Sequence, residues 1–113
     1  MKLDIWEFVR LMVAVENQAD NPLMQAFGEQ WQEVDQALEA LSQSDRIAYS
    51  DMMLNQEIDL GALNRDQKAA GAAALQKVIA ELKTMEEDLE PDDAETIKLE
   101  RKALAKRLKG FKS

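Results

Sequence analysis

The sequence contains no cysteine and no histidine. Without cysteine the chain has neither a disulfide framework nor a thiolate nucleophile. Without histidine it lacks the commonest general base and the commonest metal ligand, which excludes catalytic triads, Cys–His dyads, ferritin-type di-iron sites and ordinary zinc sites. The four glycines fit no phosphate-binding loop. We therefore expect a protein that is not an enzyme and that needs no metal or cofactor.

Proline and glycine are also scarce, with two prolines and four glycines among 113 residues. An all-β protein needs many more tight turns than these residues allow. Alanine, leucine, glutamine, glutamate and lysine are abundant, and all five favour helices. A hydrophobic content of 46% and a charged content of 32% are typical of a folded domain. The composition predicts one all-α domain that spans residues 1–113.

Long apolar runs are missing as well. No stretch of about 18 consecutive apolar residues exists, so no segment is expected to span a membrane. The apolar N-terminal stretch is interrupted by Asp4, Glu7 and Arg10, which does not fit a secretory signal. We therefore expect a cytoplasmic protein without a membrane partner.

The net charge of -8 is distributed unevenly along the chain. Residues 1–97 carry 21 acids and 7 bases, whereas residues 98–113 carry 7 bases and a single acid. A body this acidic repels nucleic acid at long range, so nucleic acid is not the expected partner. Eight acids lie between positions 81 and 95 without the spacing of a calcium loop, and they indicate a solvated helix end.

One stretch has an unbroken heptad pattern, which predicts a long helix packed against a second helix. Asn21 and Pro22 form a typical start for this helix, which we expect to end near Ser42. Its apolar positions, spaced 3, 4, 3, 4 and 3 residues apart, are Met24, Phe27, Trp31, Val34, Leu38 and Leu41.

The first helix is predicted from Ile5 to Gln18, with a capping box formed by Asp4 and Glu7. Its apolar arc covers about half of the helix circumference, which is wider than one neighbouring helix needs. Two interpretations stay open: the helix is wedged between two others, or part of it faces a second subunit or a partner. One edge of the arc is Ile5, Phe8, Met12 and Val15, and the next edge is Trp6, Val9 and Val13.

Three further segments complete the prediction. A shorter helix is expected from Asp45 to Glu57, then a loop over residues 58–63 with buried leucines, and then a helix from Asn64 to Leu89. The apolar stripe of this last helix is Leu75, Val78, Leu82, Met85 and Leu89. Its small first half, residues 69–74, is expected to pack on the bulky Met24, Phe27 and Trp31. The predicted fold is an up-and-down bundle of four main helices and one shorter helix with coiled-coil-like seams.

A fifth helix follows Pro91 and ends in the basic segment. Arg101 falls on the apolar seam of this helix. Either its aliphatic stem packs on the seam while its guanidinium group reaches water, or it sets the helix register by pairing with an acid. The lysines indicate a solvated face that pairs weakly with the acidic body, a docking element for an acidic partner, or a nucleic-acid contact. The candidate docking residues are Arg101, Lys102, Lys106 and Lys109.

These features favour a protein–protein interaction protein, an adaptor or chaperone-like bundle that binds a partner segment in an apolar groove between helices. The apolar surface exceeds the needs of one small bundle, so we expect a homodimer. The candidate residues for the partner or dimer interface are Trp6, Val9, Met12, Val13, Phe27 and Trp31. The alternative is an acidic, phage-encoded inhibitor that imitates nucleic acid and occupies a basic cleft. Spaced acids such as Glu29, Glu33, Asp35 and Glu39 allow this second function.

Overall fold

The computed structural model describes residues 1–112, so the last position of the predicted basic segment 98–113 lies outside the described residues. The chain is all-α, as expected, with a very small sheet in addition. Its elements are β1 (Lys2–Asp4), α1 (Ile5–Val15), α2 (Pro22–Ser44), α3 (Arg46–Asn55), β2 (Glu57–Asp59), α4 (Arg65–Asp88) and α5 (Pro91–Lys112).

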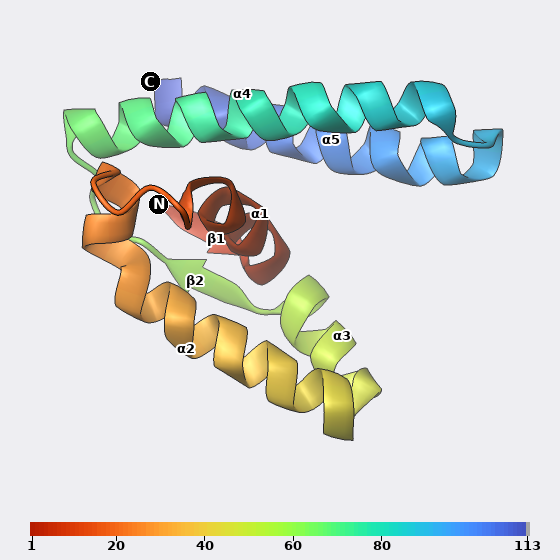
Figure 1. Cartoon of the computed structure of the whole chain (residues 1–113), viewed down its shortest axis with the longest axis horizontal. Coiled ribbons are helices and arrows are strands. Elements are labelled where there is room, and N and C mark those ends of the chain that lie inside the picture. The colour runs from red at the N-terminus through yellow and green to blue at the C-terminus, as the bar shows by residue number, and fades with distance from the viewer. Residues whose placement is uncertain (113) are drawn as a thin grey trace.

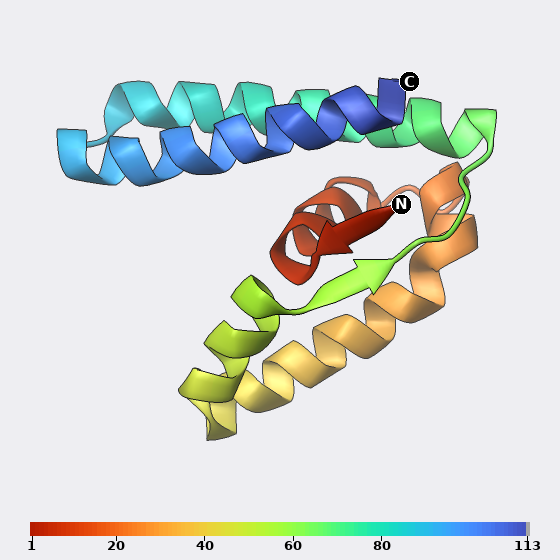
Figure 2. The same ribbon diagram turned by 180° about the vertical axis from the view of Figure 1, so that it is seen from behind.

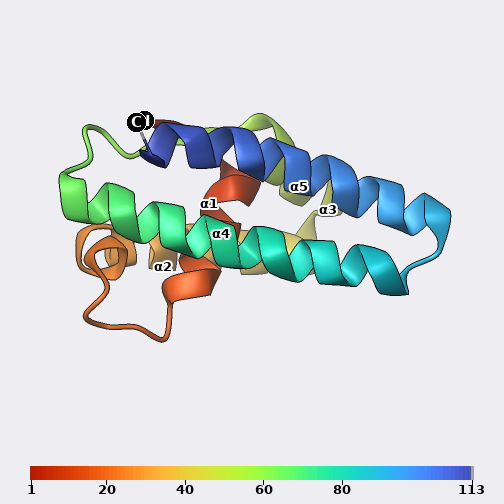
Figure 3. The ribbon, with the colours of Figure 1, turned by 90° about the horizontal axis from the view of Figure 1, so that it is seen from above.

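The helices form three layers (Figure 1). The long helices α4 and α5 run antiparallel as a hairpin on one side of the molecule, and they form the most extensive helix–helix contact of the chain. The helices α2 and α3 lie on the opposite side, and α1 lies between the two layers. Figure 3 shows that α1 crosses beneath the hairpin instead of running alongside it. Because α1 touches α2, α3 and α4, it is the central element of the core.

The two strands form an antiparallel pair beside α1 (Figure 2), with Leu3 opposite Ile58. The prediction of a loop over residues 58–63 is therefore partly wrong, because Glu57–Asp59 is a strand. Leu60 is buried, as expected for that segment, and Leu63 is only partly buried. Strands of three residues carry almost no local pattern, and this one exists because the distant N-terminal strand pairs with it.

The helix starts follow the predicted capping chemistry. The Asn21 side chain accepts a hydrogen bond from the backbone N–H of Leu23 at 2.9 Å, and the Asn64 side chain accepts one from Gln67 at 2.8 Å. These bonds satisfy backbone donors that a helix N-terminus leaves unpaired. The predicted ends were less accurate, since α1 stops at Val15 instead of Gln18 and α3 stops at Asn55 instead of Glu57.

The heptad stripe of α2 forms the core of the lower layers, as predicted. Phe27, Trp31, Val34 and Leu38 are buried. The Trp31 ring meets the ring of Phe8 on α1 edge to face, with 6.4 Å between the ring centroids. This arrangement suits the positive edge and negative face of aromatic rings. The stripe of α2 therefore packs on α1 at this point, and α2 also contacts α3 and α4.

The predicted stripe of α4 is buried only along part of its length. Leu75, Val78 and Leu82 are buried, but Met85 is 46% exposed and Leu89 is 37% exposed. The expectation that the last two residues are covered was wrong. The reason is geometric, because the far end of the hairpin extends past α1 and leaves nothing beneath it (Figure 1).

The small first half of α4 receives a bulky side chain that the sequence analysis did not predict. A Cβ atom at Gly71 would overlap the ring of Phe111 from α5. The absence of a side chain at Gly71 therefore lets α5 approach α4 closely at this end of the hairpin. The helices α2 and α4 also contact each other, and α2 diverges from α4 further along (Figure 1). The specific contact with Met24, Phe27 and Trp31 stays a prediction.

Candidate interaction surface

The outward face of α1 carries three apolar side chains that are not fully covered. Trp6 and Val9 are partly buried against the core, and Val13 is 48% exposed. Their spacing of three and four residues puts them on one face of the helix. The neighbouring edge of the apolar arc holds Phe8 and Met12, which are fully buried. The two predicted edges of the apolar arc therefore have different environments.

Three of the predicted interface residues belong to the core of the single chain. Met12 has no exposed surface, and Phe27 and Trp31 are buried between α2 and its neighbours. A partner cannot reach these side chains in this conformation, so their assignment to an interface is corrected. The sequence pattern missed this because a wide arc shows how much of a helix is apolar, and not which edge meets the rest of the chain.

A hollow of about 320 Å³ lies where the start of α1 meets α5. Trp6 and Ala103 give it an apolar part, and Lys106 stands at its side. The structure thus brings together one residue from the predicted interface set and one from the predicted docking set. The residues around the hollow are Asp4, Trp6, Glu7, Ala103, Lys106 and Arg107.

An ion pair that the sequence analysis missed fixes one wall of this hollow. Glu7 is only 3% exposed, and both of its carboxylate oxygens lie 2.9 Å from Nε of Arg107, which donates to them. The hydrogen bond to Glu7 raises the pKa of Arg107 further above its ordinary value. Glu7 also accepts a hydrogen bond from the backbone N–H of Asp4 at 3.0 Å, as the capping box predicted.

A signal for this pair exists in the sequence. Glu7 stands among Ile5, Trp6 and Phe8 on a helix whose apolar arc is unusually wide. A carboxylate in such a position is rarely buried without a cation. The identity of the cation could not be inferred, because Arg107 lies 100 positions further along the chain.

Arg101 is also committed to an acid of the same chain. Its Nε donates to Glu86 on α4 at 2.6 Å, and a second nitrogen donates to the same carboxylate at 3.3 Å. The hydrogen bond from Arg101 lowers the pKa of the Glu86 carboxyl group. The same bond raises the pKa of the Arg101 guanidinium group. The interpretation of Arg101 as a seam residue paired with an acid is therefore confirmed for the pairing. The prediction that Arg101 docks an external partner is corrected, because its guanidinium group already pairs with Glu86.

The remaining docking candidates differ from the arginines. Lys102, Lys106 and Lys109 are all exposed. Within residues 1–112 the structure records no ion pair for any of the three. The basic end of the chain thus uses its arginines internally and presents its lysines outward.

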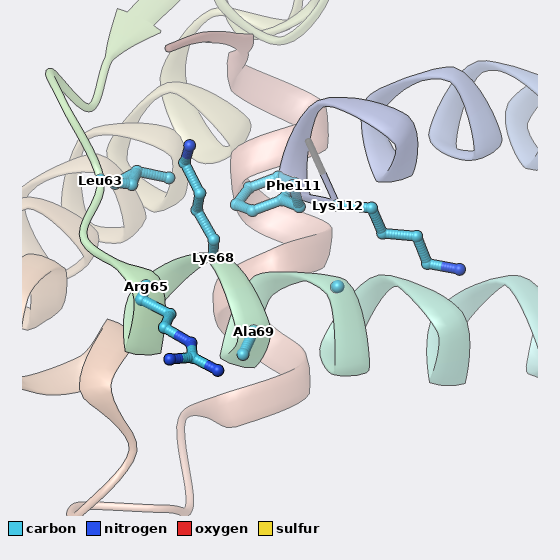
Figure 4. A pocket seen from close by; sticks show the side chains of 7 residues that line it. Leu63, Arg65, Lys68, Ala69, Phe111 and Lys112 are labelled. Carbon is cyan, nitrogen blue, oxygen red and sulfur yellow. The ribbon is translucent and has the colours of Figure 1, made fainter.

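Two other hollows have charged side chains of α4 in their linings. One of about 330 Å³ contains Val13 together with Lys77 and Glu81 of α4. Another, of about 470 Å³, lies where α4 begins and α5 ends, with Phe111 at its centre (Figure 4). Its basic side chains Arg65, Lys68 and Lys112 leave the rim in different directions, so they do not converge on one ligand position.

Neither metal chemistry nor known relatives add to this picture. Among residues 1–112, no group of three or more acidic side chains is arranged to hold a metal ion. No helix in the same range is long and apolar enough to cross a membrane. The chain matches no family model, no curated protein and no solved structure.

Proposed function

We propose that this protein is a non-enzymatic interaction protein, an adaptor or a chaperone-like module, that binds a segment of another protein along α1. The observation that carries the proposal is an incompletely covered apolar edge, on which Trp6 and Val9 are partly buried and Val13 is exposed. This edge continues into the hollow between α1 and α5, where Ala103 adds a small apolar contact. A helix edge of this kind is a typical docking surface for an amphipathic partner helix.

Trp6 has the properties of a binding anchor. Its ring packs partly on the core, which restricts its motion, and the rest of it faces the hollow. Partly ordered aromatic side chains lose little entropy when a partner covers them, and tryptophan is enriched among the residues that dominate binding energies. This supports Trp6 as the central contact of the surface.

The charge next to this edge indicates what the partner carries. Lys106 lines the same hollow as Trp6, and Lys102 is exposed one helical turn earlier on α5. Neither has a recorded ion pair within residues 1–112. A partner segment that complements this surface has apolar side chains three and four residues apart and acids along one flank.

The proposal is tested by affinity capture from the source cell followed by mass spectrometry, with two charge-insertion variants. Val13→Glu puts a carboxylate on the proposed surface, while Ile47→Glu puts one on α3, where Ile47 is 85% exposed. Both positions are open enough for the chain to tolerate the change. We expect a specific partner to be lost with Val13→Glu and kept with Ile47→Glu. Equal retention by both variants would contradict the proposal.

The acidic-inhibitor function has one observation in its favour. The charged residues of α2 are all acidic, because the helix contains Glu29, Glu33, Asp35 and Glu39 and no lysine or arginine. All four acids are exposed. A complex made through this face weakens steeply as salt rises, whereas an apolar docking at α1 weakens little. Measuring the affinity of the captured complex at low and high salt separates the two functions.

A further inference from the structure

The outward face of α5 carries a second heptad stripe, opposite the face that packs on the rest of the molecule. Leu104 and Phe111 define the packed face and are buried. The six residues of the outward stripe are all exposed, and they include Leu99, which is 61% exposed. The outward stripe, spaced 3, 4, 3, 4 and 3 residues apart, is Asp92, Glu95, Leu99, Lys102, Lys106 and Lys109.

The order of charges in this stripe makes it complementary to itself when reversed. Its two acids come first, and its lysines come last. The stripe consists of three pairs whose two members lie equally far from its centre, namely positions 92 and 109, 95 and 106, and 99 and 102. Two antiparallel helices joined along a heptad seam align their positions in this reversed order.

We infer that two copies of this chain associate through the outward faces of α5, antiparallel and about a two-fold axis. Asp92 then lies opposite Lys109 of the partner subunit, and Glu95 lies opposite Lys106 of the partner subunit. Leu99 packs at the centre on the aliphatic stem of Lys102 of the partner subunit, whose ammonium group extends to water. The two-fold axis repeats every one of these contacts.

Charge complementarity is the reason to assign this face to a second copy. A parallel pairing would put acids against acids and lysines against lysines, which is unfavourable. The arginines of α5 that have acid partners, Arg101 and Arg107, bind Glu86 and Glu7 of their own chain. The lysines of the stripe have no recorded ion pair within residues 1–112, so their charges remain for a partner.

The exposed stripe of α4 provides an internal comparison. It has the same heptad spacing, but it is mostly small or uncharged, and its terminal charges Asp66 and Glu87 have the same sign. Its seven positions do not align with themselves when reversed. Its first six positions do, but they form one pair of opposite charges, Asp66 with Lys83, and otherwise join only alanines and Gln76. Its exposed residues are Asp66, Ala69, Ala73, Gln76, Ala80, Lys83 and Glu87. Heptad spacing alone is therefore not the argument, since only the α5 stripe combines it with reversed charges and a central leucine.

This association shares Lys102 and Lys106 with the charged flank of the proposed partner-binding surface, but its apolar contact is Leu99 and not the apolar edge of α1. It moves the expected dimer interface from the first two helices to α5. The seam contains one leucine among charged residues, so the dimer is expected to be weak and sensitive to salt. Lys106 belongs both to the stripe and to the hollow beside Trp6, so the second copy lies next to that hollow.

The test uses two charge-reversal variants that cannot pair with themselves. Asp92→Lys/Glu95→Lys makes every charge of the stripe positive, and Lys106→Glu/Lys109→Glu leaves Lys102 as its one basic residue. Sedimentation equilibrium at low salt is expected to show a dimer for the unmodified chain and monomers for each variant alone. An equimolar mixture of the two variants is expected to form a heterodimer, because every outer pair then joins opposite charges. High salt is expected to weaken the dimer of the unmodified chain about tenfold or more.

A control variant, Gln76→Glu/Lys83→Glu on the exposed stripe of α4, should dimerise like the unmodified chain. Circular dichroism confirms that each variant is folded before its association is measured. The inference is overturned if the unmodified chain is monomeric at high micromolar concentration and low salt. It is equally overturned if either folded variant dimerises like the unmodified chain, or if the mixed variants fail to associate.

Discussion

The two ends of the α4–α5 hairpin carry the same kind of apolar stripe and have different environments. The inner part is the end where α4 begins and α5 ends, and it lies over α1. The outer part is the end around the turn between the two helices, and it extends past α1 (Figure 1). Leu75, Val78 and Leu82 are buried in the inner part, whereas Met85 and Leu89 continue the stripe into the outer part and are exposed. The stripe shows which face of the helix turns inward, and the extent of the neighbouring layer decides how much of that face is covered.

The two parts are also held together differently. The inner part closes through shape, because Phe111 fills the space that Gly71 leaves. At the border of the outer part, Arg101 and Glu86 form an ion pair whose side chains are both partly exposed. Packing of buried apolar groups contributes several kcal/mol per side chain, while exposed ion pairs contribute about 0–1 kcal/mol. The inner part should therefore dominate the stability of the hairpin.

The largest expected effect comes from Phe111→Ala. Removing this buried ring leaves a cavity against Gly71 and should lower the free energy of unfolding by about 3–5 kcal/mol. The matched change in the outer part, Leu89→Ala, should cost less than about 0.5 kcal/mol, since Leu89 is already exposed. Urea unfolding followed by circular dichroism measures both. Similar losses for the two variants would contradict the contrast between the inner and outer parts.

The next effect is expected from Glu7→Ala, which breaks the contact between α1 and the inner part of α5. It removes the hydrogen bonds to Arg107 and to the backbone of Asp4, and should lower the free energy of unfolding by about 1.5–3 kcal/mol. Arg107 is 39% exposed, so water compensates for part of the loss. The exposed pair between Arg10 and Glu100 provides the control, and Glu100→Gln should cost about 0–1 kcal/mol.

A smaller effect is expected from Gly71→Ala, because the added Cβ meets the ring of Phe111. Forcing this ring aside should cost about 1–3 kcal/mol. In the Phe111→Ala background the same change should instead stabilise the helix by up to about 1 kcal/mol, since alanine is the better helix former. A double-mutant cycle measured by urea unfolding shows this reversal of sign. An unfavourable effect of equal size in both backgrounds would rule out the contact as its cause.

The smallest effect concerns acid stability in the outer part. Since Arg101 lowers the pKa of Glu86 below its ordinary value of 4.5, the pair stabilises the fold above that pH. The stabilisation is lost as the pH falls below 4.5 and through the lowered pKa. Arg101→Gln should therefore reduce the stability difference between neutral and acidic pH. Thermal unfolding over this pH range tests it, with Glu87→Gln, at an exposed neighbouring acid, as the control.

The helices and their caps could be predicted because their causes are local. Asn21, Asn64 and Glu7 satisfy backbone groups within three residues of themselves, and apolar spacing shows the inward face of each helix. Such signals need no knowledge of the rest of the chain. The all-α class and the α2 core stripe were accessible for this reason, whereas the pairing of Arg101 with Glu86 joins two helices and was one of two interpretations that the sequence left open.

The tertiary structure alone decided which surfaces meet. Three contacts join segments at least 40 residues apart: the pairing of β1 with β2, the packing of Phe111 on Gly71, and the ion pair of Glu7 with Arg107. It also decided that Met12 and Trp31 are core while Trp6 and Val13 face outward. Periodicity defines the faces of a helix but not its neighbours, because contacts between distant segments depend on the packing of the whole chain.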